Sequence, residues 1–515
     1  MVIKKIKVRV FTFFDTMVST KKSFKKKEYS HTDIISLFDT LLTSIFDAEQ
    51  SFFENSKNFS QLESSVKSST DAFAAGFLGA ILSEMDQAIR NTSWRNGRYT
   101  IHRNDTRTLI SSGGDISFDC TYYKSKTEKN TFTHLLEELI GLEKNERFTE
   151  VAESFMLCEA LKTSYAEAAK VLPSKQEITK TTVMNKVHSI ADEIPDKIYD
   201  KPRTVPYLHI EADEDHVAEQ HGRYGGDENA SFISKLIYLY EYRQESADAE
   251  GRYELVNKYY FSGLYPGTEG NKQLWSRVNT FIETNYDTEA LKRVFISGDG
   301  AGWIKSGVTY VDNSVFCADK YHLMKYVNAA AAQMPNEKDN VKKELWHLMY
   351  SKQKNSRKKF DAYTTAMMNS AKKTEKIEEL RKYVLGNWTA VRRTLRNKLV
   401  NGCSAESHVS HVLSDRLSSR PMGWSQTGAD RMSKLRCYDR NNGRAAIIDL
   451  VKYSREHRHL KATGTDDIAP QNLQLRNILA EHYNQAESYI ERMQAHIPNG
   501  TVRKALAIRE KLYLL

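Results

Sequence analysis

The spacing of apolar residues predicts two kinds of element near the start of the chain. Over residues 31–91 apolar side chains recur every three or four positions, the period of one buried helix face. This segment should form two or three packed helices. Over residues 106–123 two runs of β-forming residues flank the glycine-containing stretch 111–115, a pattern typical of a β-hairpin. Residues 31–130 are therefore expected to form a helical region that contains a hairpin.

A helical pattern returns over residues 131–195 and contains a candidate DNA-binding motif. Residues 164–172 predict a short amphipathic helix, and Thr179 is placed to cap a second helix over residues 180–190. Two short helices across a tight turn are typical of a helix-turn-helix, whose second helix enters the major groove. A helix pair that only packs together has the same pattern. The residues expected to face DNA are Lys180, Thr181, Thr182, Asn185 and Lys186.

Strand patterns follow a proline-containing linker at residues 196–205. Residues 205–216 alternate apolar and polar positions, and Asp213 is expected to close this strand. Residues 232–242 and 253–261 are rich in Ile, Tyr, Leu and Val. They should form two further strands and complete an antiparallel trio.

A helix over residues 271–285 then leads to a buried strand over 294–297, which ends at Asp299 between Gly298 and Gly300. Loops at the carboxyl ends of central strands are where sheets present catalytic groups, and flanking glycines let a phosphate or metal approach the backbone. A Gly-Asp-Gly turn without any function has the same pattern. Neighbouring acidic positions must therefore decide between the two interpretations.

One such position is Asp319, which ends a further predicted strand over residues 314–319. His322 follows at the start of the next helix, so the two side chains can meet at its first turn. An Asp N-cap with an unrelated histidine gives the same spacing.

Another acidic position is Glu406, which precedes Val409, Leu413 and Leu417 at helical spacing. A carboxylate on the inward stripe of a helix needs a partner, because burying an uncompensated charge is costly.

Asp213, Asp299 and Glu406 therefore come from two strand ends and one helix. A site for phosphoryl transfer holds two divalent ions about 3.5–4 Å apart and needs hard anionic oxygens to bind them. We predict that these three residues are catalytic and bind the metal ions, with Mg²⁺ or, as a substitute, Mn²⁺.

Composition narrows the alternatives. The chain has 515 residues, of which 40% are apolar, and it lacks a long uncharged apolar run, so we expect a cytoplasmic multidomain protein without a membrane-spanning helix. The first residues do not have the features of a signal peptide. The five cysteines form no Cys-x-x-Cys pair, which favours reduced thiols over a zinc ribbon or disulfides.

The net charge of +9 is unevenly distributed. Residues 1–30 contain nine Lys or Arg and two acids, and residues 337–398 contain seventeen and seven. Basic blocks that flank an acidic centre suit a polyanion held on both sides, although solvated helix faces carry the same charges. We expect a flexible basic arm at residues 1–30, an all-helical segment at 335–400 and a helical C-terminal region at 431–515.

The motifs together resemble those of bacterial insertion-sequence transposases of the DDE type, most closely the ISLre family. The Asp-x-x-His element is also similar to one in Mutator-like transposases. Asp215 remains an alternative to Asp213, although the strand alternation favours Asp213. The resemblance rests on Glu211-Ala212-Asp213, on the Gly-Asp-Gly-Ala-Gly-Trp-Ile run at 298–304, on Asp319-Lys320-Tyr321-His322, on Ser404-Ala405-Glu406 and on residues 415–424.

The resemblance implies an α+β or α/β multidomain protein with an RNase H-like core, in which an all-helical insertion precedes the last core helix at residues 401–430. It implies an enzyme, acting as a homo-oligomer, that binds the terminal inverted repeats of its insertion sequence and target DNA. With two divalent cations it would cleave and transfer DNA strands, and Asp319 and His322 would lie at the edge of the active site. The remaining alternatives are a DNA-binding regulator that has lost catalysis and an RNase H-like nuclease without strand transfer.

Two arginines after Glu406 complete the predicted site. On a straight helix ended by Pro421, Arg416 and Arg420 would lie on one side, next to the stripe of Glu406. We predict that they hold the DNA backbone beside the scissile phosphate, because a guanidinium can bind two phosphate oxygens. A surface ion pair with Asp415 is the alternative.

Overall fold

The computed structural model describes residues 31–463, except 221–229, 248–250, 252, 372, 401 and 421, together with residues 474, 475, 477 and 478. The expected basic arm and most of the expected C-terminal region lie outside these residues. The chain divides into two compact units. Unit 1 contains the described residues of 1–149, 173–176 and 465–515, and unit 2 contains those of 150–172 and 177–464.

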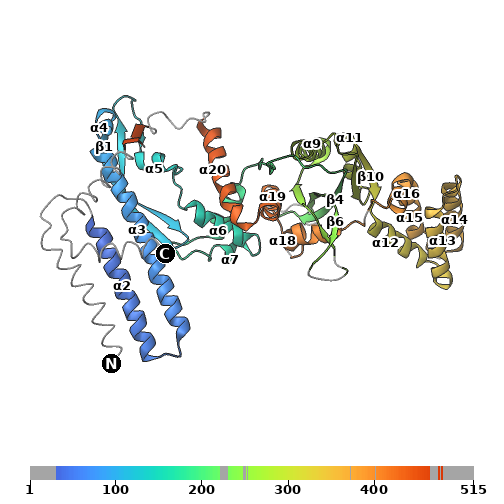
Figure 1. Cartoon of the computed structure of the whole chain (residues 1–515), viewed down its shortest axis with the longest axis horizontal. Coiled ribbons are helices and arrows are strands. Elements are labelled where there is room, and N and C mark those ends of the chain that lie inside the picture. Colours follow the sequence, from blue (N-terminus) through green and yellow to red (C-terminus); the bar gives the residue numbers. More distant parts are fainter. Residues whose placement is uncertain are drawn as a thin grey trace. The chain divides into compact units, whose positions relative to one another are not determined.

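Unit 1 combines a helical hairpin with a small antiparallel sheet (Figure 1). The two long helices pack along each other, as the apolar spacing predicts, and the hairpin over residues 106–123 is confirmed. The fully buried Asp86 of the second helix accepts a hydrogen bond from the backbone N–H of Thr121 (2.9 Å). The elements are α2 (His31–Glu54), α3 (Phe59–Asn91), α4 (Ser93–Arg98), β1 (Tyr99–Ser111), β2 (Gly114–Ser125), β3 (Phe132–Thr133) and α5 (Leu135–Ile140).

The centre of unit 2 is a five-stranded mixed sheet with the strand order β10-β9-β4-β5-β8. The β4–β9 and β9–β10 pairs are parallel, whereas β4–β5 and β5–β8 are antiparallel, so the expected trio is confirmed. Its strands are β4 (Tyr207–Ala218), β5 (Ser231–Tyr240), β8 (Tyr259–Gly263), β9 (Arg293–Gly298) and β10 (Ser314–Ala318). The third predicted strand, 253–261, is divided, because β7 (Tyr253–Leu255) pairs with β6 (Arg243–Glu245) in a separate ribbon.

Helices cover both faces of this sheet. Alternate residues of β4, such as Ile210, pack with Trp275 of α9 (Gly267–Asn285) in one core. On the other face, Ser234 of β5 contacts Ser433 of α19 (Gln426–Asn442) through their hydroxyl groups (2.8 Å). The other elements on this face are α17 (Ala405–Val409), the π-helical turn η3 (Ser410–Ser414) and α18 (Asp415–Leu417).

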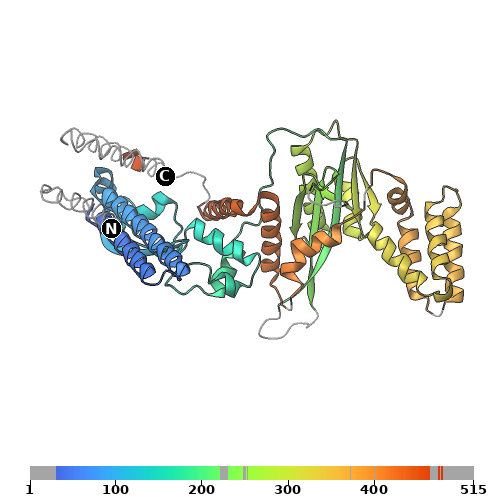
Figure 2. The same cartoon turned by 60° about the horizontal axis from the view of Figure 1, so that its bottom comes forward.

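The described elements of residues 335–396 are all helices, joined by loops, as expected for the segment 335–400. Figure 2 shows α13 (Lys338–Tyr350) and α14 (Ser356–Ser370), in yellow, side by side beyond α12 (Lys320–Ala331). The remaining helices of unit 2 are α6 (Glu150–Ala160), α7 (Tyr165–Ala168), α8 (Lys180–His188), α10 (Gly302–Lys305), α11 (Gly307–Tyr310), η2 (Pro335–Glu337), α15 (Glu375–Gly386), α16 (Trp388–Arg396), η4 (Arg444–Ala446) and α20 (Ile447–Thr463).

Side chains from two helices bond to the outer edges of the sheet. At the β8 edge, Asn441 of α19 accepts a hydrogen bond from the N–H of Tyr260 and donates one to its carbonyl (both 2.8 Å). At the β10 edge, the hydroxyl of Thr394 in α16 donates to the carbonyl of Ala318 (2.7 Å). These backbone groups, which would otherwise be free to pair with another strand, therefore have side-chain partners.

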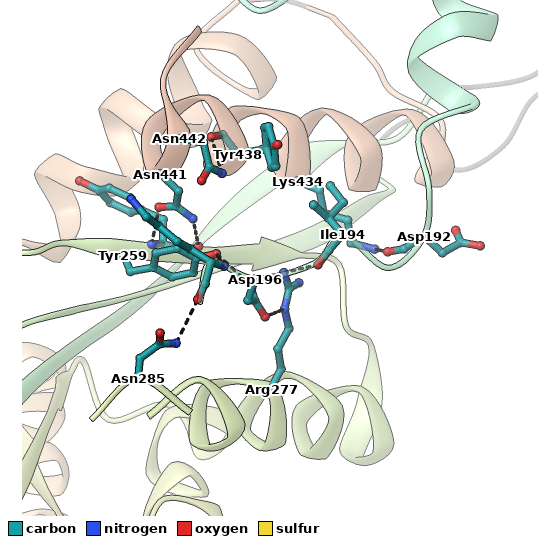
Figure 3. A network of polar contacts seen from close by, with 12 residues as sticks. Asp192, Ile194, Asp196, Tyr259, Arg277, Asn285, Lys434, Tyr438, Asn441 and Asn442 are labelled. Atoms are coloured by element: carbon teal, nitrogen blue, oxygen red, sulfur yellow. Dashed lines mark hydrogen bonds and ion pairs between the residues drawn. The ribbon is translucent and has the colours of Figure 1, made fainter. Parts of the chain in front are cut away.

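The segment expected to be a linker is bound to unit 2 by a polar network (Figure 3). Arg277 of α9 donates two hydrogen bonds to the carboxylate of Asp196 (2.7 Å each) and one to the carbonyl of Ile194 (3.1 Å). Asn285 accepts a hydrogen bond from the N–H of Tyr199 (2.7 Å). Residues 194–199 are therefore an ordered strap.

The described part of the chain has no helix with the length and apolar character needed to cross a bilayer. All five cysteines lie in this part as free thiols, as expected.

The strap yields a prediction about stability. Arg277→Met should lower the free energy of unfolding of unit 2 by about 2–4 kcal/mol, because it removes the ionic partner of the partly buried Asp196. Chemical denaturation of the full chain measures the effect. Lys272→Met, at an exposed position of the same helix, is the control and should change stability by less than about 0.5 kcal/mol. Equal effects of the two substitutions would show that the strap does not stabilise unit 2.

Candidate active site

Three aspartates follow one register across the parallel strands. The parallel ladders place Glu211 of β4 and Cys317 of β10 on either side of Ser297 of β9. Continuing this register by two residues keeps the same face of the sheet, because side chains alternate along a strand. The residues reached in this way are Asp213, Asp299 and Asp319, which we call the aspartate row.

The prediction that Asp213 closes its strand is wrong. β4 continues to Ala218, because its second half pairs antiparallel with β5. Asp213 instead lies where β4 passes the end of its parallel partner β9. The aspartate row therefore marks the carboxyl end of the parallel part of the sheet.

Steric constraints explain why glycine stands on both sides of Asp299. A Cβ on Gly298 would lie 2.9 Å from the carbonyl oxygen of Ala212, so only glycine allows β9 to approach β4 this closely. Gly300 has φ +99°, and a Cβ there would lie 3.2 Å from the side-chain amide of Asn387. Asp299 is half-buried between them and accepts a hydrogen bond from the N–H of Ala301 (2.8 Å).

The electrostatics of Asp213 reveal which charges surround it. Burial raises the pKa of this carboxyl to about 6, against a lowering by the hydrogen bond from the N–H of Glu214. The negative charges of Asp299 and Glu406 raise the pKa further, and the opposing charge of His322 lowers it. Carboxylates from the neighbouring strand and from one helix thus act on Asp213.

Asp319 both caps a helix and holds His322. Its carboxylate accepts a hydrogen bond from the N–H of Tyr321 (2.8 Å) and lies 2.6 Å from Nδ1 of His322. This contact raises the pKa of His322, and the charges of Asp213 and Asp299 add to the rise. Asp319 is thus an N-cap and also a side-chain partner of His322, so both interpretations of the Asp-x-x-His spacing apply.

Glu406 lies in the first turn of α17, but its side chain is exposed. The expectation that it shares the buried stripe of Val409, Leu413 and Leu417 is therefore wrong, although those three residues are buried. The physical reason is that the position one turn before Val409 is occupied by the buried Ala405, which leaves Glu406 about 60° away from that line at 100° per residue. The charge of Glu406 nevertheless acts on Asp213.

Glu211 fixes the start of α17. Its carboxylate, 1% exposed, accepts hydrogen bonds from the N–H of Ser404 (2.6 Å) and from the hydroxyl groups of Tyr240 (2.8 Å) and Tyr238. In the sequence analysis Glu211 is part of the motif that includes Asp213, but no role is predicted for it. The signal was its position two residues before Asp213, which puts both side chains on one face of β4.

The choice between Asp213 and Asp215 also needs a correction. The two residues are two positions apart and share one face of β4, so strand alternation does not separate them. Their contacts do separate them, because the hydroxyl of Ser418 donates a hydrogen bond to Asp215 (2.8 Å), whereas Asp213 interacts with Asp299 and Glu406.

The two predicted phosphate-binding arginines differ. Arg416 is 4% exposed, donates a hydrogen bond to the carbonyl of Ala160 (2.8 Å) and stacks over the ring of Trp424 (4.7 Å to its centroid). It packs inside unit 2 and cannot face DNA, so this prediction is wrong. Arg420 is exposed.

The predicted helix-turn-helix is a cluster of α6, α7 and α8. Thr179 caps α8 by accepting a hydrogen bond from the N–H of Thr182 (3.2 Å), as predicted. Residues 169–179 separate α7 from α8, which is longer than a tight turn. Lys186 binds Glu153 of α6 (2.9 Å) inside the cluster. The exposed members of the predicted DNA face are Lys180, Thr181 and Asn185, and Thr182 is half-buried.

Carboxylate oxygens are the donors that hard divalent cations prefer, and the repulsion among Asp213, Asp299 and Glu406 would fall if a cation bound them. The donor set thus fits such an ion by its chemistry. Within the described ranges, however, no three His, Cys, Asp or Glu side chains form a ready-made metal-binding group.

The raised pKa of Asp213 gives a prediction that does not depend on activity. This carboxyl has a pKa of about 6 when folded, above its ordinary value of 3.8, so its ionisation destabilises the fold above about pH 6. This destabilisation disappears below about pH 3, where the carboxyl is protonated in both states. In EDTA, Asp213→Asn should therefore be more stable than the wild type by about 1–3 kcal/mol near neutral pH and equally stable near pH 3.

Thermal or urea unfolding at several pH values measures this difference. Asp200→Asn, at an exposed position, is the control and should match the wild type throughout. A neutral-pH loss of stability in Asp213→Asn would mean that a positive partner already balances this carboxylate.

Comparisons with known proteins give the family. The uncharacterised protein family UPF0236 matches residues 52–452. Two UPF0236 proteins of Caldanaerobacter subterraneus subsp. tengcongensis are 35% identical over 405 residues (78% of this chain, 82% of the relative) and 36% identical over 397 residues (77% and 80%). A chain described as "Drosophila P element transposase strand transfer complex" covers 70% of this chain and 89% of its own length, at 11% identity and a TM-score of 0.20, which does not establish a shared fold. Because the family match spans most of the sequence, the chain belongs to the UPF0236 family.

Proposed function

We propose that the protein is a DDE-type DNA transposase in which Asp213, Asp299 and Glu406 hold two divalent cations, Mg²⁺ or Mn²⁺, for DNA strand cleavage and strand transfer. The observation that carries the proposal is the shared strand register, which brings Asp213 of β4 to the end of β9 beside Asp299. Burial raises the pKa of Asp213 to about 6, and the negative charges of Asp299 and Glu406 add to this rise. Carboxylates that lie close together repel one another, and a bound cation stabilises them.

The topology of the sheet supports the same proposal. Three antiparallel strands, a helix and two parallel strands follow one another in the chain, which is the order of an RNase H-like core. Helical residues 335–396 lie in sequence between the strand that ends before Asp319 and the helix that carries Glu406. This is where the resemblance to ISLre transposases implies an insertion.

Each side chain of the site would have a distinct role. Bound divalent cations would activate an oxygen nucleophile and neutralise charge on the phosphate. Asp213, Asp299 and Glu406 would supply anionic oxygens. Asp319 holds Nδ1 of His322 and favours its charged form, so the ring would present positive charge to a DNA phosphate near the aspartate row.

DNA recognition is the second part of the proposal. The exposed face of α8, with Lys180, Thr181 and Asn185, would read the terminal inverted repeats as the second helix of a helix-turn-helix. Several copies of the chain would assemble on the two ends and on target DNA. Arg416 and Lys186 are not part of the proposed DNA contacts, because their side chains are bound inside unit 2.

The test of this function is a comparison of cleavage and binding in magnesium. Asp299→Asn and Glu406→Gln should each lower cleavage and strand transfer at least about 100-fold, because each removes charge that holds the cations. Binding to the ends of the element should stay within about twofold of wild type.

Asp215→Asn is the matched control. It neutralises a neighbouring carboxylate on the same face of β4, but one that is bound to Ser418, so cleavage should persist. Full cleavage by Asp299→Asn would exclude the metal role. Binding to the ends with no cleavage by the wild-type protein would favour a DNA-binding regulator.

A further inference from the structure

A cavity of about 480 Å³ opens in unit 2 beside α18 and α19. None of its lining residues belongs to the aspartate row. Five basic side chains line it, which are Lys162, Arg420, Arg436, Arg440 and Arg444. We call this cavity the arginine pocket.

Positive charge exceeds negative charge in the arginine pocket. Two acids, Asp415 and Asp439, also line it, which leaves a formal excess of three positive charges, 5 − 2 = +3. Asp439 is already bound by both Nε and Nη2 of Arg444 (3.2 Å each). Asp415 is then the one acid left in the lining opposite the other four basic side chains.

The two arginines of α19 that line the pocket, Arg436 and Arg440, donate hydrogen bonds to neutral groups. Arg436 donates hydrogen bonds to the carbonyls of Leu161 (2.5 Å) and His411 (2.8 Å), and Arg440 donates one to His411 (3.3 Å). Carbonyl groups orient a guanidinium but do not cancel its charge. Burial lowers the pKa of Arg436 and the like charge of Arg440 lowers it further, against the opposing charges of Asp415 and Asp439.

The size and lining of the pocket indicate what it can bind. Its volume lies in the range of small-molecule sites, about 300–1,000 Å³, but such sites are mostly apolar. Leu161 is the apolar residue among the nine that line this one. Several guanidinium groups that converge on one space are suited to phosphate, because each can bind two phosphate oxygens.

We propose that the arginine pocket binds a backbone phosphate of DNA at a distance from the cleavage site. This inference rests on the proposed function and adds a contact to it. α17, η3 and α18 form one continuous segment with Glu406 near its start and Arg420 just after its end.

The π-helical turn connects the two places. Its residues His411 and Val412 offer their carbonyl groups to Arg436 of the pocket, while α17 begins directly before it. A phosphate bound in the arginine pocket would thus set where the same DNA strand meets Glu406.

The experiment uses the full chain and the double variant Arg420→Gln/Arg440→Gln. Both side chains are exposed, so the fold should persist. The probe is a 20-base-pair duplex (about two helical turns), and its affinity is measured over a range of salt concentrations. Loss of two phosphate contacts should lower the slope of log K against log salt by about 1.8 and weaken binding about tenfold at physiological salt.

Two further variants keep the measurement decisive. Lys292→Gln/Arg293→Gln removes two exposed charges at the amino end of β9 and should leave the slope unchanged. Lys162→Gln removes one exposed charge from the pocket and should lower the slope by about 0.9. If the pocket variants behave like the β9 control, the DNA contact does not exist.

A free phosphate is the other source of the same chemistry. Inorganic phosphate would then raise the melting temperature of the wild type but not of the double variant, while the duplex slope stayed unchanged. If neither the duplex nor inorganic phosphate distinguished the double variant from the wild type, the arginine pocket would not be a phosphate site. Asp299→Asn separates this result from the proposed function, because it should keep the wild-type salt slope and lose cleavage.

Discussion

The buried carboxylate of Glu211 is the constraint on which the candidate site depends. A carboxylate that is 1% exposed is tolerated only when its oxygens are hydrogen-bonded. Tyr238 and Tyr240 on β5 and the backbone N–H of Ser404 before α17 supply these bonds. Strands far from residue 404 in sequence are thereby joined to the helix that carries Glu406. The position of Glu406 therefore follows from the hydrogen bonds that the buried carboxylate of Glu211 needs. The side chain of Glu406 is exposed and can reach solvent and ligands.

The aspartates follow from backbone geometry. Parallel strands β4, β9 and β10 share one register, so residues just past the end of the ladders meet on one face whatever lies between them in sequence. For this reason the positions of Asp213, Asp299 and Asp319 could be inferred from strand patterns that end in acids. The same patterns could not show that β4 continues to Ala218, because its length is set by β5 and not by its own composition.

The failures of sequence reasoning have a common physical origin in contacts between distant residues. Arg416 packs against Trp424 and the carbonyl of Ala160, and Lys186 binds Glu153 on a different helix. Neither contact has a periodic signature. The π-helical turn at Ser410–Ser414 also invalidates the constant angular step used to place residues after Glu406. The arginine pocket escaped prediction because its basic side chains come from separate segments of the chain.

The bonded edges of the central sheet have a consequence for the synthesis of the protein. The last strand of the sheet ends at Ala318, but the side chains that bond to its edges, Thr394 and Asn441, come later in the chain. At 5–20 residues per second, a ribosome needs roughly 6–25 s to make the roughly 120 residues from Ala318 to Asn441. During that interval the nascent sheet has unpaired backbone groups on both sides, at the stage when a strand from another chain can still be added. The growing polypeptide therefore passes through a period of exposure to mispairing that ends only when α16 and α19 have been made.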